Sequence, residues 1–161
     1  MINGVHLHLL LNHVPILGSV FALVLLIIGY FNRNEVLSKT GLWTLVVVSL
    51  VAISVFLSGE EAEHAVEGIM GVSEVSIETH EDQAAIAFWS LMCSGAIALG
   101  TLLSALKSQN IHRTLLLLNV FFMLGTFVLM ARAGNSGGAI RHPEINATAS
   151  SSGGEEEHGE D

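Results

Sequence analysis

Four long apolar runs restrict most strongly what this chain can fold into. A helix needs roughly 20 mostly apolar residues to cross the hydrocarbon core of a bilayer. The four runs lie at about residues 5–31, 41–59, 83–106 and 114–131. Short connectors follow the first and third runs, so each of those two pairs should form an antiparallel hairpin. The sequence therefore predicts an all-α fold, a transmembrane four-helix bundle with up-down-up-down topology and one domain over residues 1–145.

Composition and charge exclude several classes of protein. The chain is 51% hydrophobic and 13% charged, whereas soluble domains average roughly 25% charged residues. The net charge of −9, without a basic stripe, argues against nucleic-acid binding. The single cysteine, Cys93, excludes an intrachain disulfide. No positive residue precedes the first apolar run, so we expect a retained helix rather than a cleaved signal peptide.

The charges of the connectors predict an orientation. Arg33 and Lys39 lie in the first connector, and Lys107 and Arg113 flank the third, whereas the second (60–82) carries eight acidic residues and no lysine or arginine. By the positive-inside rule the first and third connectors face the cytoplasm. Both termini and the acidic connector then lie on the outer side.

The remaining segments are predicted from their local patterns. EEAEHAVEGI has helical spacing and is expected to extend the second span beyond the lipid. VSEVSIETHEDQ is expected to be a helical lead-in to the third span, with Ser76 or Thr79 as its N-cap. Residues 146–161, NATASSSGGEEEHGED, are low-complexity and acidic, which predicts a disordered tail.

The histidines sort to one side of this predicted bundle. Because the chain reverses after each span, all four helices bring a histidine to the outer half, and only His112 is cytoplasmic. The outer histidines are His6, His8, His13, His64, His80 and His142. Ionisable residues within a membrane usually face the bundle interior and mark a functional site. The pattern therefore predicts a site at the outer end.

His13 is the deepest of these histidines. It lies about eight residues into the first span, which is roughly 12 Å below the surface at ~1.5 Å rise per residue. His8, Asn12 and Pro15 share an adjacent face of the helix. The Asn12 amide is suited to orienting an imidazole, and Pro15 frees the backbone carbonyl of Leu11.

A b-type haem is the cofactor that this pattern favours. It needs two neutral imidazoles on facing helices, and His13 and His80 are the preferred axial pair, with His6, His8, His64 and His142 in reserve. Glycines after the fourth span predict that GGAIRHPEI folds back over the outer mouth, where Arg141 would pair with a haem propionate. Such a protein would pass electrons between a quinone or a redox partner protein and an external carrier.

Two other hypotheses about function stay open. In the first, Cu, Zn or Fe is bound without haem, since Glu61-x-x-His64 is the carboxylate–imidazole pair of di-iron bundles. The second half of that site would come from Glu78 and His80, but Glu-x-x-His is missing there. In the second hypothesis, the chain is a cofactor-free subunit of a membrane complex or a homo-oligomer. The sequence has no nucleophile–base motif, phosphate loop or zincin signature, so a stand-alone hydrolase or transferase is not expected.

Four stretches also carry a resemblance: HLHLLLNHVPILG, SGEEAEHAVEG, VSIETHED and GGAIRHPEI. Together they resemble an uncharacterised family of small four-span bacterial membrane proteins, over about residues 5–145. His-Val-Pro at 13–15 is also distantly similar to a signature of predicted haem- or redox-associated membrane proteins. The resemblance implies a multi-pass protein of the bacterial inner membrane, with the lipid bilayer as its surroundings.

Overall fold

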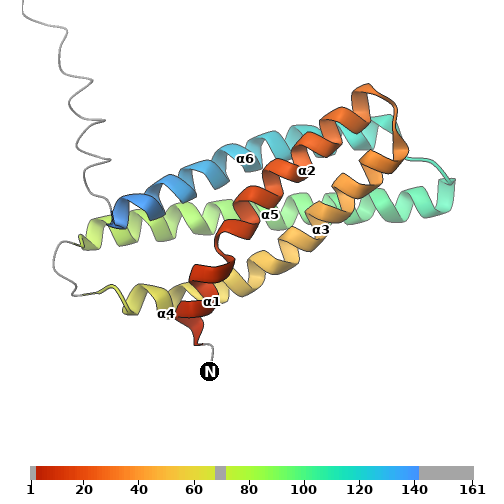
Figure 1. The fold of residues 1–161 in the computed structure, drawn as a ribbon. Coiled ribbons are helices and arrows are strands. Elements are labelled where there is room, and N and C mark those ends of the chain that lie inside the picture. The colour runs from red at the N-terminus through yellow and green to blue at the C-terminus, as the bar shows by residue number, and fades with distance from the viewer. Residues whose placement is uncertain (1–2, 68–71, 142–161) are drawn as a thin grey trace, which may run out of the picture.

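The computed structural model describes residues 3–67 and 72–141, and every regular element in these ranges is an α-helix (Figure 1). The helices are α1 (Gly4–Leu11), α2 (His13–Phe31), α3 (Glu35–Leu57), α4 (Gly59–His64), α5 (Glu74–Ser108) and α6 (Arg113–Arg141). Four segments are long and apolar enough to cross a membrane: Gly4–Phe31, Glu35–Leu57, Glu74–Ser108 and Arg113–Ile140. The prediction of an all-helical chain with four candidate spans is confirmed, and the predicted tail lies outside the described residues.

The long helices close into a ring. α2 packs against α3 and α6, and α5 packs against the same two helices. Figure 1 shows α1, α4, the start of α5 and the end of α6 together at one end of the bundle. We call this the histidine end, because His6, His8, His64 and His80 belong to these elements and His13 begins α2, two residues after the end of α1. The opposite end carries the connectors 32–34 and 109–112.

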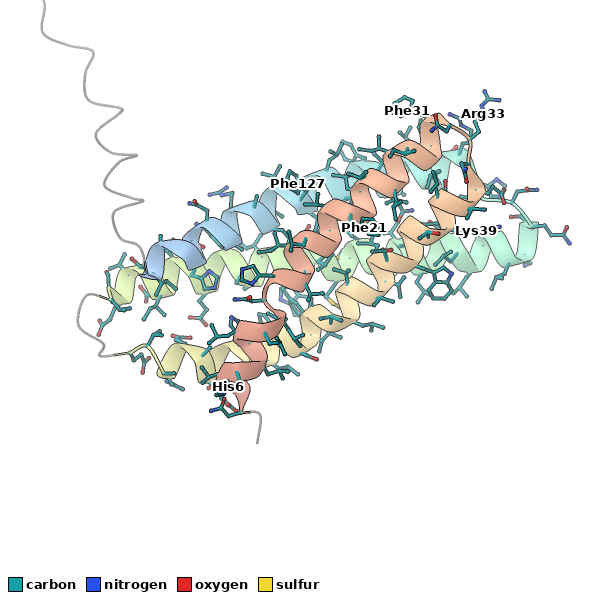
Figure 2. The ribbon with its side chains drawn as sticks, in the orientation of Figure 1. His6, Phe21, Phe31, Arg33, Lys39 and Phe127 are labelled. Atoms are coloured by element: carbon teal, nitrogen blue, oxygen red, sulfur yellow. The ribbon has the colours of Figure 1, made fainter. Side chains whose placement is uncertain are left out.

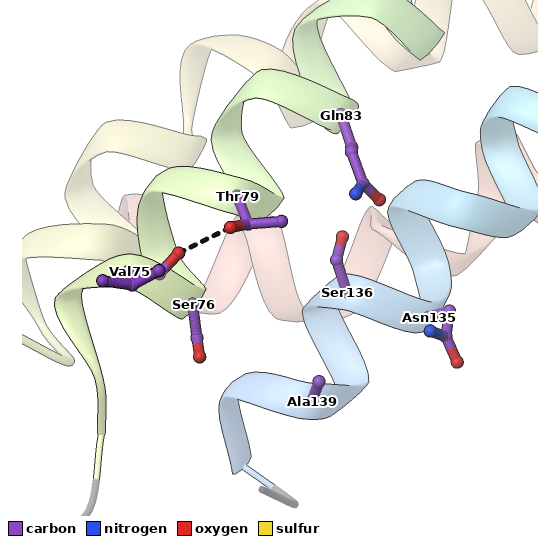
Figure 3. Close-up of a pocket in the computed structure, with 7 residues that line it drawn as sticks. All are labelled: Val75, Ser76, Thr79, Gln83, Asn135, Ser136 and Ala139. Atoms are coloured by element: carbon purple, nitrogen blue, oxygen red, sulfur yellow. Dashed lines mark hydrogen bonds between the residues drawn. The ribbon is translucent and has the colours of Figure 1, made fainter. Parts of the chain in front are cut away.

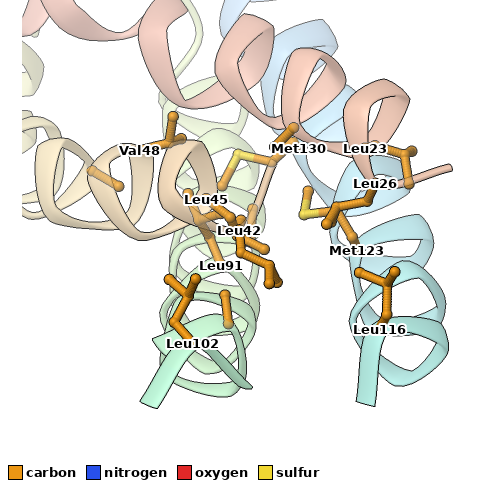
Figure 4. Close-up of a cluster of buried hydrophobic side chains, with 14 of the residues drawn as sticks. Leu23, Leu26, Leu42, Leu45, Val48, Leu91, Leu102, Leu116, Met123 and Met130 are labelled. Carbon is orange, nitrogen blue, oxygen red and sulfur yellow. The ribbon is translucent and has the colours of Figure 1, made fainter. Parts of the chain in front are cut away.

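Apolar side chains fill the centre of the ring and also cover its outside. Leu26, Leu42, Leu45, Leu91 and Met123 are completely buried (Figure 4). On the outer surface, large side chains such as Phe21, Trp43 and Phe121 are more than half exposed (Phe21 is labelled in Figure 2). A soluble monomer rarely exposes apolar surface on this scale, whereas lipid tails solvate it.

Polar contacts join α5 to α6 inside the apolar core. The hydroxyls of Ser90 and Ser94 on α5 each lie 2.8 Å from the Thr126 hydroxyl on α6. Further along, the Asn119 amide donates to the Thr101 hydroxyl at 2.8 Å. Hydrogen bonds between helices substitute within a membrane for the hydrophobic driving force that operates in water. These two sets fix how α5 and α6 are aligned.

The first span differs from the continuous helix expected over 5–31. The helix breaks at Asn12, which ends α1 and precedes α2. The cause is Pro15, whose ring clashes with the carbonyl of Leu11 four residues earlier and which has no N–H to donate to it. The break turns the direction in which α1 presents its histidines relative to α2.

Three other boundaries also differ from expectation. The helix expected after the second span is present over Gly59–His64 as α4, but it is interrupted at Ser58 and is not continuous with α3. α5 begins at Glu74 with Ser73, not Ser76 or Thr79, at its N-cap. α6 continues to Arg141, so the chain does not turn back at its glycines. A helical glycine costs only about 1 kcal/mol relative to alanine, which contacts with neighbouring helices offset.

Candidate functional site

His8 is held in place by the end of another helix. Its Nδ1 lies 3.1 Å from the backbone carbonyl oxygen of Val55 on α3. That carbonyl belongs to the last turn of α3, where it also accepts a hydrogen bond from the Ser58 hydroxyl at 3.1 Å. Because a carbonyl can only accept, Nδ1 is the protonated nitrogen and donates to it. In the neutral imidazole of His8, the lone pair therefore lies on Nε2.

His80 is held in the same way from the other side of the bundle. Its Nδ1 lies 3.1 Å from the carbonyl oxygen of Ala133 and 3.2 Å from the hydroxyl of Ser136, both on α6. Ser136 itself donates to the Ala133 carbonyl at 3.0 Å. His80 therefore also carries its proton on Nδ1, with the lone pair on Nε2.

A glycine makes room for the His80 imidazole. A Cβ atom built at Gly137 would lie 2.9 Å from His80 Cε1 and 3.2 Å from Nδ1. These distances are shorter than ordinary van der Waals contact, so a larger residue would displace the ring from its hydrogen bonds. The glycine run in the sequence thus serves ring packing rather than a turn.

We call His8 and His80 the imidazole pair, because each donates Nδ1–H to a backbone carbonyl of a neighbouring helix. Both are half-buried. Within residues 3–67 and 72–141, neither Nε2 makes a hydrogen bond. Asn12, one helical turn after His8, adds a buried side-chain oxygen without a partner in the same part of the chain. His8 and His80 can thus each present an Nε2 lone pair, and Asn12 adds one free hydrogen-bond acceptor.

The other candidate histidines lie elsewhere. His13 is exposed at the start of α2. His6 is exposed and its Nδ1 lies 2.6 Å from the Asn3 side-chain oxygen. His64 is exposed beside Glu67, with 3.2 Å between Nδ1 and a carboxylate oxygen. This hydrogen bond with Glu67, with the attraction of its charge, raises the pKa of His64.

The carboxylates of the metal hypothesis are also dispersed. Glu61 accepts a hydrogen bond from the backbone N–H of Gly4 at 2.7 Å and so ties α4 to the start of α1. Glu78 is exposed on α5. Within the described ranges, no group of three or more histidine, cysteine, aspartate or glutamate side chains is arranged to hold a metal ion. Arg141 ends α6, and His142 lies outside these ranges.

The groups that hold His8 and His80 in place were not predicted from the sequence. Val55 and Ala133 contribute only backbone oxygens, which no side-chain pattern reveals. Gly137 and Ser136 were visible in the run GNSGG, but there they indicated a turn. Comparison with family models, with curated proteins and with solved structures gave no match for this chain.

Proposed function

We propose that this chain is a membrane electron-transfer protein that binds a b-type haem between His8 and His80. One observation carries the proposal: both imidazoles donate Nδ1–H to a backbone carbonyl, so both present Nε2 as a fixed lone pair. Ligating histidines almost always have this second hydrogen bond, because it fixes the tautomer and the orientation of the ring. His8 replaces His13 in the axial pair preferred from the sequence.

The number of ligands favours haem over a bare metal ion. A zinc, copper or iron ion bound by protein alone needs three or four side chains. The described residues provide no such group, whereas the pair provides two imidazoles. Two are enough for haem, because the porphyrin supplies the four equatorial nitrogens and the protein only the axial positions.

The surroundings of His80 also suit a flat apolar group. Ala84 and Ala87 follow His80 on one face of α5, and Gly137 faces the ring from α6. Beside them, Phe56 and Phe88 stack with their ring centroids 4.2 Å apart and join α3 to α5. Small residues next to a ligand, with aromatic rings behind them, provide space and exclude water.

We also propose on which side of the membrane the histidine end lies. With the basic connectors inside, the histidine end faces the outer side of a bacterial inner membrane. An acidic connector next to the haem would attract a basic electron-transfer partner from that side. A quinone is the corresponding partner within the lipid.

A visible absorption spectrum of the detergent-purified full chain, expressed with ample haem, tests the proposal. We expect a Soret band that shifts on dithionite reduction, with sharp α and β bands of low-spin haem. His8→Ala and His80→Ala should each abolish the low-spin bands, whereas the matched controls His6→Ala and His13→Ala should keep them. Haem retained unchanged in both His8→Ala and His80→Ala would contradict the ligand assignment.

Two other outcomes would replace the proposal. A featureless spectrum together with bound copper, zinc or iron in elemental analysis would favour a non-haem metal site completed outside the described residues or by a second copy. A featureless spectrum without metal, and with co-purifying membrane proteins, would favour a structural subunit.

A further inference from the structure

A pocket of about 230 Å³ lies between the start of α5 and the end of α6 (Figure 3). Its polar lining comes from Ser76, Thr79 and Gln83 on α5 and from Asn135 and Ser136 on α6. Val75 and Ala139 complete it with apolar surface. The haem proposal makes no use of this pocket.

Among the described residues, the lining mixes polar and apolar groups and includes no charged side chain. A charged ligand would therefore enter without a partner for its charge, which is costly away from water. A phospholipid phosphate is a poor candidate for the same reason, because phosphate recognition normally uses arginine or lysine. The pocket is suited to a neutral molecule that forms hydrogen bonds.

Its hydrogen-bonding groups are available to a ligand. Within the described residues, the side-chain amides of Gln83 and Asn135 make no hydrogen bond, and each offers donors and an acceptor. The Thr79 hydroxyl donates to the Val75 carbonyl at 2.7 Å and keeps its own acceptor free. In Figure 3, the Gln83 amide reaches from α5 toward Ser136 on α6. Such a set of donors and acceptors can form hydrogen bonds with the carbonyl groups and with the hydroxyl groups of a ligand.

The pocket is joined directly to His80. Ser136 lines the pocket and is nine-tenths buried, and its hydroxyl lies 3.2 Å from His80 Nδ1. A molecule bound there is one serine away from the proposed haem ligand. The pocket also lies near one end of two candidate membrane spans, Glu74–Ser108 and Arg113–Ile140.

We propose that this pocket binds the neutral head group of a quinone or quinol. Pockets for drug-sized ligands start at about 300 Å³, so this smaller one takes a single substituted ring and leaves the isoprenoid tail in the lipid. Ring carbonyls accept from the amides of Gln83 and Asn135, and ring hydroxyls donate to the same amides. The exchange of electrons between this ring and haem rests on the proposed function, but binding does not.

Photolabelling with a short-chain azidoquinone tests the inference on the full chain in nanodiscs, with the labelled peptides mapped by mass spectrometry. We expect label within residues 75–83 and 135–139, and competition by an unlabelled short-chain ubiquinone. Gln83→Leu and Asn135→Leu keep apolar bulk but remove the amide, and each should raise the competitor's apparent Kd about tenfold, as expected for the loss of one hydrogen bond. Asn110→Leu removes an exposed amide at the opposite end of the bundle; it is the matched control and should leave Kd unchanged.

Label spread over lipid-facing segments, which unlabelled quinone does not displace, would overturn the inference. So would specific label that is unaffected in both amide variants. Recording the haem spectrum of the same samples separates the two proposals. Specific labelling in protein without haem would support the pocket and overturn the haem proposal, whereas haem without specific labelling would overturn only the pocket.

Discussion

At the scale of single residues, Gly137 is the position on which the His80 imidazole depends most directly. Gly137→Ala should push the ring away from the Ala133 carbonyl and destabilise the protein by about 1–3 kcal/mol, the usual cost of overpacking. Gly138→Ala is the matched control, because a Cβ there meets nothing within 4 Å. This control should be neutral or slightly stabilising, since alanine favours helix.

The free energy of unfolding of both variants in mixed detergent micelles checks this prediction. The low-spin absorption bands give a second reading, which should be lost or broadened only in Gly137→Ala. Equal stability of the two variants would show that the contact between Gly137 and His80 is unimportant.

His64 provides a residue-scale prediction about pH. Its pKa is raised in the folded chain, chiefly by the hydrogen bond with Glu67. The interaction with Glu67 therefore stabilises the fold fully below the ordinary histidine pKa, and the effect is lost as pH rises through the raised value. An NMR titration should give a midpoint for His64 above about 6.5, moving down in Glu67→Gln. Glu78→Gln, a change of the same kind at an exposed position, should leave the midpoint in place.

At the scale of elements, the contact between α5 and α6 depends on the Thr126 hydroxyl. Thr126→Val keeps the shape of the side chain but leaves the hydroxyls of Ser90 and Ser94 without their shared partner. We expect a loss of about 1–2 kcal/mol in the free energy of unfolding. Thr114→Val, at an exposed position of the same helix, should change it by less than about 0.5 kcal/mol. Equal values for the two variants would contradict the role of these contacts.

The existence of the spans was predictable, but several of their ends were not. Hydropathy predicts which residues lie in lipid. A helix can continue beyond the lipid wherever its backbone N–H and C=O groups remain hydrogen-bonded. α5 starts at Glu74, within the helical lead-in expected over VSEVSIETHEDQ, whereas α6 runs to Arg141, beyond the apolar window expected at 114–131. The break at Asn12 was not expected, although its cause, Pro15, was visible in the sequence.

That break also explains why the site could be predicted only in part. The gathering of histidines near one end follows from the reversals of the chain, which sequence reveals. Which of them face inward depends on helix phase, and a break shifts that phase. Assuming one continuous helix favoured the deep His13, whereas α1 brings His8 to the Val55 carbonyl instead. Ser136 and Gly137 contact His80 across 56 and 57 residues of chain, a pairing that no local pattern contains.

At the scale of the whole molecule, the ring of four long helices brings basic residues to one end of the bundle and acidic residues to the other. Arg33 and Lys107 belong to the end opposite the histidines, where Arg113 also lies 4.5 Å above the Tyr30 ring. The carboxylates of α4 and of the start of α5 belong to the histidine end. A bundle polarised in this way should insert with one orientation, and that orientation decides which compartment reaches His8 and His80.

Cysteine labelling in intact bacteria tests that orientation. In a Cys93→Ser background, which lacks thiols, Ala65→Cys adds a single exposed cysteine at the histidine end and Asn110→Cys adds one at the opposite end. A membrane-impermeant maleimide should label position 65 in intact cells and position 110 only after permeabilisation, because basic connectors are retained in the cytoplasm. The reverse pattern would place the histidine end inside, and an electron carrier outside the cell membrane would then be unable to reach the proposed haem.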